Sequence, residues 1–191
     1  MMAISIPFSG WYEEHSSFNV KFNHGITTLI GRNGSGKTSM INEINAFLKK
    51  QEIPVYLYSQ LVEGASITGK GLLYGDTKTA ATYMQSSEGE KVIVSYGSTL
   101  RTIQKFLADN RDKEYTFLLC DGLDSGVSIN IIRQLDEIFD LLRNDYPNVV
   151  IVNTTNNYEF TRNRRCVVAE TGEEITFDTY EEYVRFICAE E

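Results

Sequence analysis

The sequence predicts an α/β fold with a mainly parallel central sheet and helices on both of its faces. Three observations support this prediction: apolar, β-branched strands alternate with amphipathic helical segments, a glycine-rich turn joins one strand to a helix, and another apolar strand ends in an aspartate. Parallel strands bring their carboxyl ends to one edge of the sheet, where ligands of such folds bind. We therefore expect the functional site among the residues that follow the strands.

Size and charge narrow the choice of function. With 191 residues, 42% hydrophobic and 23% charged, the chain fits a single domain over residues 1–191. The net charge of −8 disfavours a broad nucleic-acid-binding face, which needs surplus Lys and Arg, but leaves room for a local basic patch. No window reaches the roughly 18 apolar residues of a membrane span, and the start lacks the features of a leader. We expect a soluble cytoplasmic protein with no membrane partner.

The cysteines indicate a reducing environment. Cys120, Cys166 and Cys188 are odd in number, widely spaced and set among apolar residues. Disulfides or a metal site are less expected from this pattern than buried free thiols.

The first third of the chain is predicted to hold four strands and one helix. The first two strands should pair as an antiparallel edge ahead of the glycine-rich turn, and Pro54 should stand at the start of the fourth strand. Lys49 and Lys50 suit the carboxyl end of the helix. The strands are expected at 3–8, 17–22, 26–30 and 53–58, and the helix at 39–50.

The remainder alternates between helices and strands. We expect a loop at 59–75 and helices at 77–86 and 91–110. Ser128 can cap a further helix, and Glu181 or Glu182 can complete a capping box at the last one. We expect strands at 115–120 and 149–152, helices at 128–144 and from 178 or 179 to 189, and a hairpin of 165–169 with 174–177 around Gly172.

The glycine-rich turn has the pattern of a phosphate-binding loop. It reads Gly31-Arg-Asn-Gly-Ser-Gly-Lys37-Thr38 and lies between the strand at 26–30 and the helix at 39–50. Glycines let backbone N–H groups approach phosphates closely, Lys37 would reach the β- and γ-phosphates, and Thr38 would place its hydroxyl on Mg²⁺. A chance glycine turn at a helix start is the alternative. The candidate nucleotide-binding residues here are Gly31, Asn33, Gly34, Ser35, Gly36, Lys37, Thr38 and Ser39.

A second candidate residue ends a buried strand. Asp121 follows the apolar run Phe117-Leu-Leu-Cys120 and is suited to hold Mg²⁺ beside the loop. The same residue could instead cap a helix or anchor a loop.

These motifs resemble ATPases of the ATP-binding-cassette (ABC) type, in particular the compact soluble branch related to chromosome-maintenance and DNA-repair ATPases and to short AAA-family proteins of bacteria and phages. The loop GRNGSGKT is similar to the ABC form of the Walker A motif. Gln60 falls where the family has a glutamine that contacts Mg²⁺ and the attacking water, and the stretch from Ser86 to Glu90 resembles the signature motif, with Ser87 and Gly89 at its γ-phosphate positions. Asp124-Ser-Gly-Val-Ser128 resembles the D-loop. The resemblance further implies that residues of about 61–110 form a reduced version of the family's helical subdomain, because only 26 residues lie between Gln60 and Ser87.

The resemblance implies a P-loop NTPase that binds ATP and Mg²⁺ at a composite site. The signature stretch is a helix start, a favourable place for an anion, but it is too far from its own loop to close over the same nucleotide. A second copy, or another protein, would supply it, so ATP would form part of a dimer interface. The alternative is that Ser87-Glu-Gly-Glu only begins a helix, with acids near its positive end.

Two departures from the family predict slow or absent hydrolysis. Gly122 stands where a glutamate directly follows the aspartate, and glycine cannot act as a base. The histidine expected after the strand at 149–152 is also missing, although Thr155 or Asn156 could hydrogen-bond a γ-phosphate. Asp124 is the nearest spare acid, but the D-loop resemblance makes it an interface residue and a poor substitute.

Two other functions remain open. Arg162, Arg164 and Arg165 form the only dense basic cluster, which is a solvated loop by default and could otherwise bind nucleic acid, phosphates or acids of a partner. With such an arginine lid the protein would be a nucleotide or small-molecule kinase. A DNA-repair or anti-defence module is the third possibility, which the acidic composition disfavours.

Overall fold

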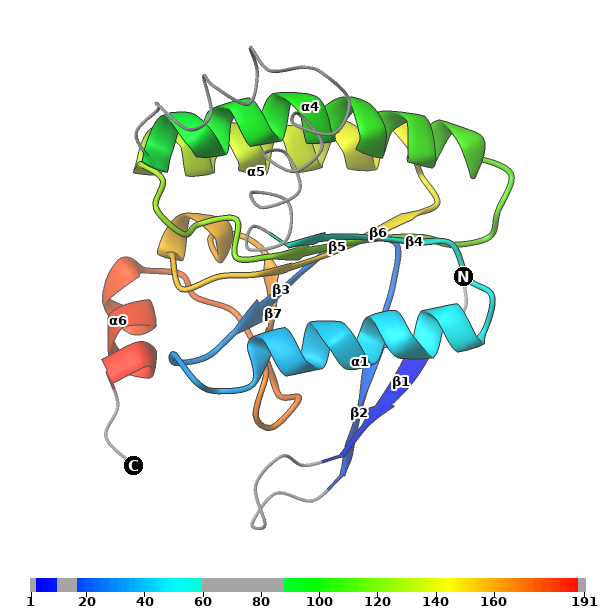
Figure 1. Cartoon of the computed structure of the whole chain (residues 1–191). Coiled ribbons are helices and arrows are strands. Elements are labelled where there is room, and N and C mark those ends of the chain that lie inside the picture. The colour runs from blue at the N-terminus through cyan, green and yellow to red at the C-terminus, as the bar shows by residue number, and fades with distance from the viewer. Residues whose placement is uncertain (1–2, 10–16, 60–87, 189–191) are drawn as a thin grey trace.

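The protein forms a six-stranded sheet with helices on both faces and a separate two-stranded sheet (Figure 1). The computed structural model describes residues 3–9, 17–59 and 88–188, with backbone alone for 88–98. The strands are β1 (Ile4–Phe8), β2 (Phe18–Phe22), β3 (Gly25–Ile30), β4 (Val55–Ser59), β5 (Thr116–Asp121), β6 (Val149–Thr154), β7 (Arg165–Val168) and β8 (Glu174–Ile175). The helices are α1 (Lys37–Lys50), α4 (Glu88–Asp109), α5 (Ile129–Asp145), α6 (Tyr180–Cys188) and the short 3₁₀ helix η1 (Tyr158–Phe160).

The central sheet is parallel apart from one edge. Its order is β4-β5-β6-β3-β7-β8, and only the β7–β8 pairing is antiparallel. The two strands that precede the predicted phosphate and metal residues, β3 and β5, flank β6 on either side. The carboxyl ends of these three strands therefore meet at one place, as the alternating pattern predicts.

Helices cover the two faces of the sheet. In Figure 1, α4 and α5 lie above the sheet and α1 lies below it. The upper core joins Ile103 and Leu107 of α4 to Leu135 and Phe139 of α5. The expected helices on both faces of the sheet are confirmed. Alternate side chains of a buried strand point to opposite faces, so each layer of helices packs against one set of them.

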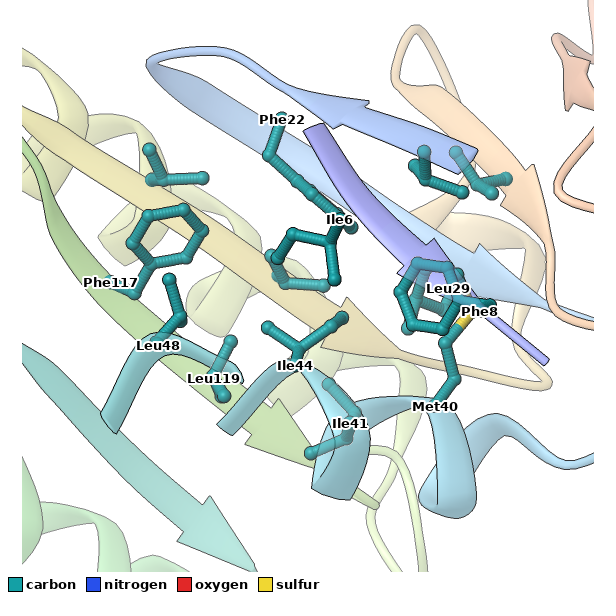
Figure 2. Close-up of a cluster of buried hydrophobic side chains, with 14 of the residues drawn as sticks. Ile6, Phe8, Phe22, Leu29, Met40, Ile41, Ile44, Leu48, Phe117 and Leu119 are labelled. Atoms are coloured by element: carbon teal, nitrogen blue, oxygen red, sulfur yellow. The ribbon is translucent and has the colours of Figure 1, made fainter. Parts of the chain in front are cut away.

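The first two strands pack against the buried side of α1. β1 and β2 pair antiparallel, with Ile6 opposite Val20, as expected. They form a sheet of their own and do not extend the central sheet. Figure 2 shows Ile6, Phe8 and Phe22 of this pair facing the buried side of α1, so the two sheets and the helix share one core.

The carboxyl-terminal elements pack at the β7–β8 edge. β7 and β8 form the expected hairpin, and Gly172 in its turn has φ +73°. At α6 the expected capping box is present: Thr179 Oγ1 accepts from the N–H of Glu182, and Glu182 Oε2 accepts from the N–H of Asp178. Ser128 precedes α5 as predicted, but its side chain makes no capping hydrogen bond. Its position was therefore predicted correctly and its capping bond was not.

Element boundaries differ from the prediction by a few residues. Asn153 and Thr154 continue β6 beyond the predicted end at 152, because parallel pairing with β3 and β5 satisfies their backbone. α1 begins at Lys37 and α4 at Glu88, each earlier than expected. The expected loop at 59–75 lies beyond the described part of the chain from residue 60 on, and so does the whole expected helix at 77–86. Among the described residues, no helix combines the length and the hydropathy needed to cross a membrane.

Candidate functional site

A cavity of about 480 Å³ opens at the carboxyl edge of the sheet, where α1 begins. It collects residues from the glycine-rich turn and from the ends of β4, β5 and β6. The lining residues are Asn33, Gly34, Gly36, Lys37, Thr38, Ser39, Ser59, Asp121, Gly122, Asp124, Ser125, Thr154, Thr155 and Asn156.

The glycine-rich turn needs its glycines. Gly31, Gly34 and Gly36 have φ of +147°, +86° and +86°, a region that other residues enter only at a cost. A Cβ on Gly31 would also overlap the side chain of Ser35. The hydroxyl of Ser35 is buried and has no hydrogen-bond partner among the described residues, which is unusual for a buried polar group. The turn thus has the backbone geometry of a phosphate-binding loop.

Lys37 lies in the first turn of α1 and reaches back over the loop. Its Nζ donates to the carbonyl oxygens of Gly31 at 2.6 Å and Arg32 at 2.7 Å. Burial lowers the pKa of Lys37, while the negative charges of Asp124, Glu170 and Asp121 act in the opposite direction. The ammonium group is therefore held in a partly desolvated, acid-lined position, where attraction to an anion is strong.

Oxygen atoms of three residues converge beside Lys37. Thr38 Oγ1 lies 3.0 Å from Asp121 Oδ2 and 3.3 Å from Asp121 Oδ1, and the hydroxyl of Thr154 donates to Asp121 Oδ1 at 2.8 Å. A carboxylate and hydroxyls are hard oxygen ligands of the kind that Mg²⁺ prefers. The residue types and their closeness fit a magnesium ion held by Thr38 and Asp121.

The loops after β5 and β6 are tied together by Asp124. Its Oδ2 accepts hydrogen bonds from Thr155 Oγ1 and from the N–H of Asn156, both at 2.7 Å. Asn156 in turn donates from Nδ2 to Asn33 Oδ1 at 2.6 Å. A continuous hydrogen-bonded chain thus runs from the end of β5 to the glycine-rich turn.

The backbone conformation at position 122 favours glycine. Its φ is +76°, and its N–H donates to Thr154 Oγ1 at 3.0 Å. A residue with a Cβ at this position would be strained. The turn that joins Asp121 to Asp124 is therefore shaped for glycine.

The predicted site residues are only partly brought together. The cavity is lined by every candidate of the glycine-rich turn except Gly31 and Ser35, which shape the turn, and it is also lined by Asp121. Gly89 lies in the first turn of α4, whereas Gln60 and Ser87 lie outside the described residues. The prediction omitted Thr154, although its place at the end of a strand next to β5 was a usable signal.

The basic cluster does not form a patch. Arg164 is only 10% exposed and makes paired hydrogen bonds to Asp136 and Asp140 on α5. Arg165 donates to Glu174 and to Thr27. The default of a solvated loop is therefore wrong for these two arginines, and it fits Arg162, which is exposed. The prediction failed because the acidic partners of Arg164 precede it by 24 and 28 residues.

The thiols agree with the prediction in two cases. Cys120 and Cys166 are buried and free, and burial raises the pKa of both thiols, that of Cys166 to about 12. Cys188 is free but exposed near the end of α6, which corrects the expectation that it is buried.

Solved structures with the same fold are nucleotide-binding cassettes. The cassette MJ1267 of an ABC transporter, in its ADP conformation, matches with a TM-score of 0.54 and 15% identity over 97% of this chain and 94% of that chain. The fold is that of an ATP-binding cassette. The cassette MJ0796, solved as a dimer with ADP and Pi, matches with a TM-score of 0.53 and 12% identity over 94% of this chain and 98% of that one. No family model and no curated protein matches the sequence.

Proposed function

We propose that the protein binds ATP with Mg²⁺ in this cavity and that the bound nucleotide controls its association with a second copy or with another protein. One observation carries the proposal: the glycine-rich turn, the ammonium of Lys37 and the Thr38–Asp121 pair line one cavity at the carboxyl edge of the sheet. The matched cassette MJ0796, a dimer with ADP and Pi, has the same fold and supports the idea by analogy.

Each group would have a distinct task. The backbone N–H groups of the glycine-rich turn and the start of α1 would hold the phosphates, and Lys37 would neutralise the β- and γ-phosphates. Thr38, Asp121 and Gln60 would hold Mg²⁺, which would draw the phosphate oxygens together. Ser87 and Gly89 of a partner would complete the site from the other side.

Turnover should be slow. Gly122 offers no acid directly after Asp121, and Thr155 and Asn156 stand where the related ATPases have a histidine. Neither a hydroxyl nor an amide takes up a proton near neutral pH. Binding with slow hydrolysis suits a protein that uses ATP as a switch for assembly.

The two other functions have less support. A kinase lid needs free guanidinium groups, but Arg164 and Arg165 are engaged with acids of their own chain. The same ion pairs remove most of the basic patch that nucleic acid would contact. Binding to nucleic acid is thus not favoured by either the net charge or the placement of the arginines.

Measuring molecular mass in solution tests the switch. Light scattering coupled to size-exclusion chromatography should show a dimer with ATP and Mg²⁺ and a smaller species with ADP or without nucleotide. The Lys37→Ala variant should stay at the smaller mass in every condition, because it lacks the ammonium group that binds the phosphates. An unchanged mass with saturating ATP would contradict self-association, and phosphorylation of a nucleoside by that unchanging species would favour the kinase.

A further inference from the structure

We propose that Asp124 is the acid that accepts a proton from the attacking water when bound ATP is hydrolysed, in place of the acid that residue 122 does not supply. This inference rests on the proposed ATP site. It assigns the residual turnover of the protein to one carboxylate oxygen, Asp124 Oδ1. It departs from the expectation that Asp124 is a poor substitute for the missing acid, because Asp124 lines the cavity of its own chain.

The carboxylate is held in a defined orientation. Both hydrogen-bond donors, the hydroxyl of Thr155 and the N–H of Asn156, reach the same oxygen, Oδ2, at 2.7 Å. The hydroxyl of Thr155 is itself oriented, because its oxygen accepts from the N–H of Asn157 at 2.8 Å. Within the described part of the chain, Oδ1 accepts no hydrogen bond, so it is available to a water molecule.

The position of Asp124 suits reaction at the γ-phosphate. It lines the cavity together with Lys37, Thr38 and Asp121. Of the acids whose negative charge raises the pKa of Lys37, Asp124 has the largest effect, ahead of Glu170 and Asp121. Asp121 is engaged by Thr38 and Thr154, and Glu170 does not line the cavity. Of the acids that line this cavity, Asp124 is therefore the one with a carboxylate oxygen that accepts no hydrogen bond from the described residues.

The chemical step balances without a further reactant. The water oxygen forms a bond to the γ-phosphorus, and the bond from that phosphorus to the bridging oxygen breaks, with its electron pair remaining on ADP. The water proton passes to Asp124 Oδ1 and then to the released phosphate. General-base assistance of this type contributes roughly 10²- to 10⁴-fold to a rate.

The substitution Asp124→Asn distinguishes a proton acceptor from a residue that only holds the loops after β5 and β6 together. In Asp124→Asn the amide oxygen can still accept from Thr155 and Asn156, while the NH₂ group that replaces Oδ1 cannot accept a proton. The variant should bind ATP within about twofold of the wild-type affinity and form ADP at least tenfold more slowly. The lifetime of its ATP-bound dimer should rise by the same factor.

Two controls complete the experiment. Asp112→Asn makes the same chemical change at a carboxylate that is 76% exposed and does not line the cavity, and it should hydrolyse ATP like the wild type. Thr155→Val removes one anchoring donor but keeps the carboxylate, so it should lose less rate than Asp124→Asn. Melting temperatures of all variants establish that each one is folded.

Several results would overturn the inference. One is that Asp124→Asn forms ADP as fast as the wild type. Another is that Thr155→Val loses more of the rate of ADP formation than Asp124→Asn does. A third is that the wild type forms no ADP after a day at saturating ATP. In each case calorimetry that still detects ATP binding leaves the proposed binding function standing. Absence of binding in the wild type would instead remove that function and this inference together.

Discussion

Gly122 shows how one backbone angle sets the chemistry available to the site. The residue turns the chain between Asp121 and Asp124 with φ +76°. It thereby directs one acid toward Thr38 and lets the other reach the loop after β6. An acidic side chain at position 122 would conflict with this turn, because a residue with a Cβ is strained there.

Substitutions at Gly122 test this explanation. Gly122→Ala should lower the free energy of unfolding by about 1 kcal/mol, since alanine must adopt the left-handed region. Gly122→Asn should cost less, because asparagine enters that region more readily. Urea unfolding of the three proteins provides the comparison. Equal stability of the alanine variant and the wild type would mean that the turn adopts an ordinary backbone angle.

Other residues differ in how far the sequence predicts them. Lys37, Thr38 and Asp121 are predictable in position because each follows from a local pattern, a glycine-rich turn or an apolar run that ends in an acid. The bond between Asn33 and Asn156 spans 123 positions. It depends on the parallel register of β3 and β6 and on the loops that follow them, which no local pattern contains.

Among the elements, α1 holds the phosphate loop against the rest of the molecule. Its buried residues, including Met40, Ile44 and Leu48, contact both the central sheet and the β1–β2 pair (Figure 2). This packing fixes the helix start, and with it Lys37 and Thr38. The sequence predicts the helix itself, but not that the β1–β2 pair and the central sheet share one core on its buried side.

Truncating the centre of α1 should weaken the whole fold. Ile44 is fully buried, so Ile44→Ala should lower the free energy of unfolding by about 3 kcal/mol through lost contacts and a cavity. Asn42→Ala, at an exposed position of the same helix, should change it by less than about 0.5 kcal/mol. Chemical unfolding followed by circular dichroism measures both. Similar values for the two variants would show that Ile44 is not buried as described.

The ion pairs of Arg164 join α5 to the chain segment that leads into β7. Hydrogen bonding to Arg164 lowers the pKa of Asp140. Burial raises the pKa of Asp136, although Arg164 acts against that rise. The arginine therefore offsets the cost of holding these carboxylates in the charged form.

Replacing this arginine should destabilise the protein in a pH-dependent way. Arg164→Met should lower the free energy of unfolding by about 2 kcal/mol near pH 7. The difference should begin to shrink above about pH 4, where Asp136, with its raised pKa, takes up a proton, and should shrink further below about pH 4, where Asp140, with its lowered pKa, loses its charge. Arg133→Met, which removes an exposed ion pair with Glu159, should have a much smaller effect. A pH-independent difference would contradict the charge pairing.

At the scale of the whole molecule, the order of the strands assembles the site. β6 lies between β3 and β5, so the ends of three strands deliver the glycine-rich turn, Asp121 and the Thr154 to Asn156 segment to one cavity. The sequence alone predicts the alternation of strands and helices and the edge at which ligands bind. It does not contain the strand order directly, so the pairing of Asp124 with Thr155 could not be predicted.

The fold also bears on the proposed switch. The cavity is open at the carboxyl edge of the sheet. A second protein molecule that docks on this edge, as proposed, would cover the nucleotide. Because binding is then linked to association, ATP should stabilise the dimer by mass action.

The proposed function requires the glycine-rich turn, Lys37 and the Thr38–Asp121 pair to bind ATP with Mg²⁺. Isothermal titration calorimetry of the wild-type protein with ATP and Mg²⁺ measures this binding, with Lys37→Ala and the surface variant Lys113→Ala as the matched pair. We expect saturable heat for the wild type and for Lys113→Ala, and at least a tenfold weaker affinity for Lys37→Ala. Absence of saturable heat from the folded wild-type protein, or equal binding by Lys37→Ala, would contradict it.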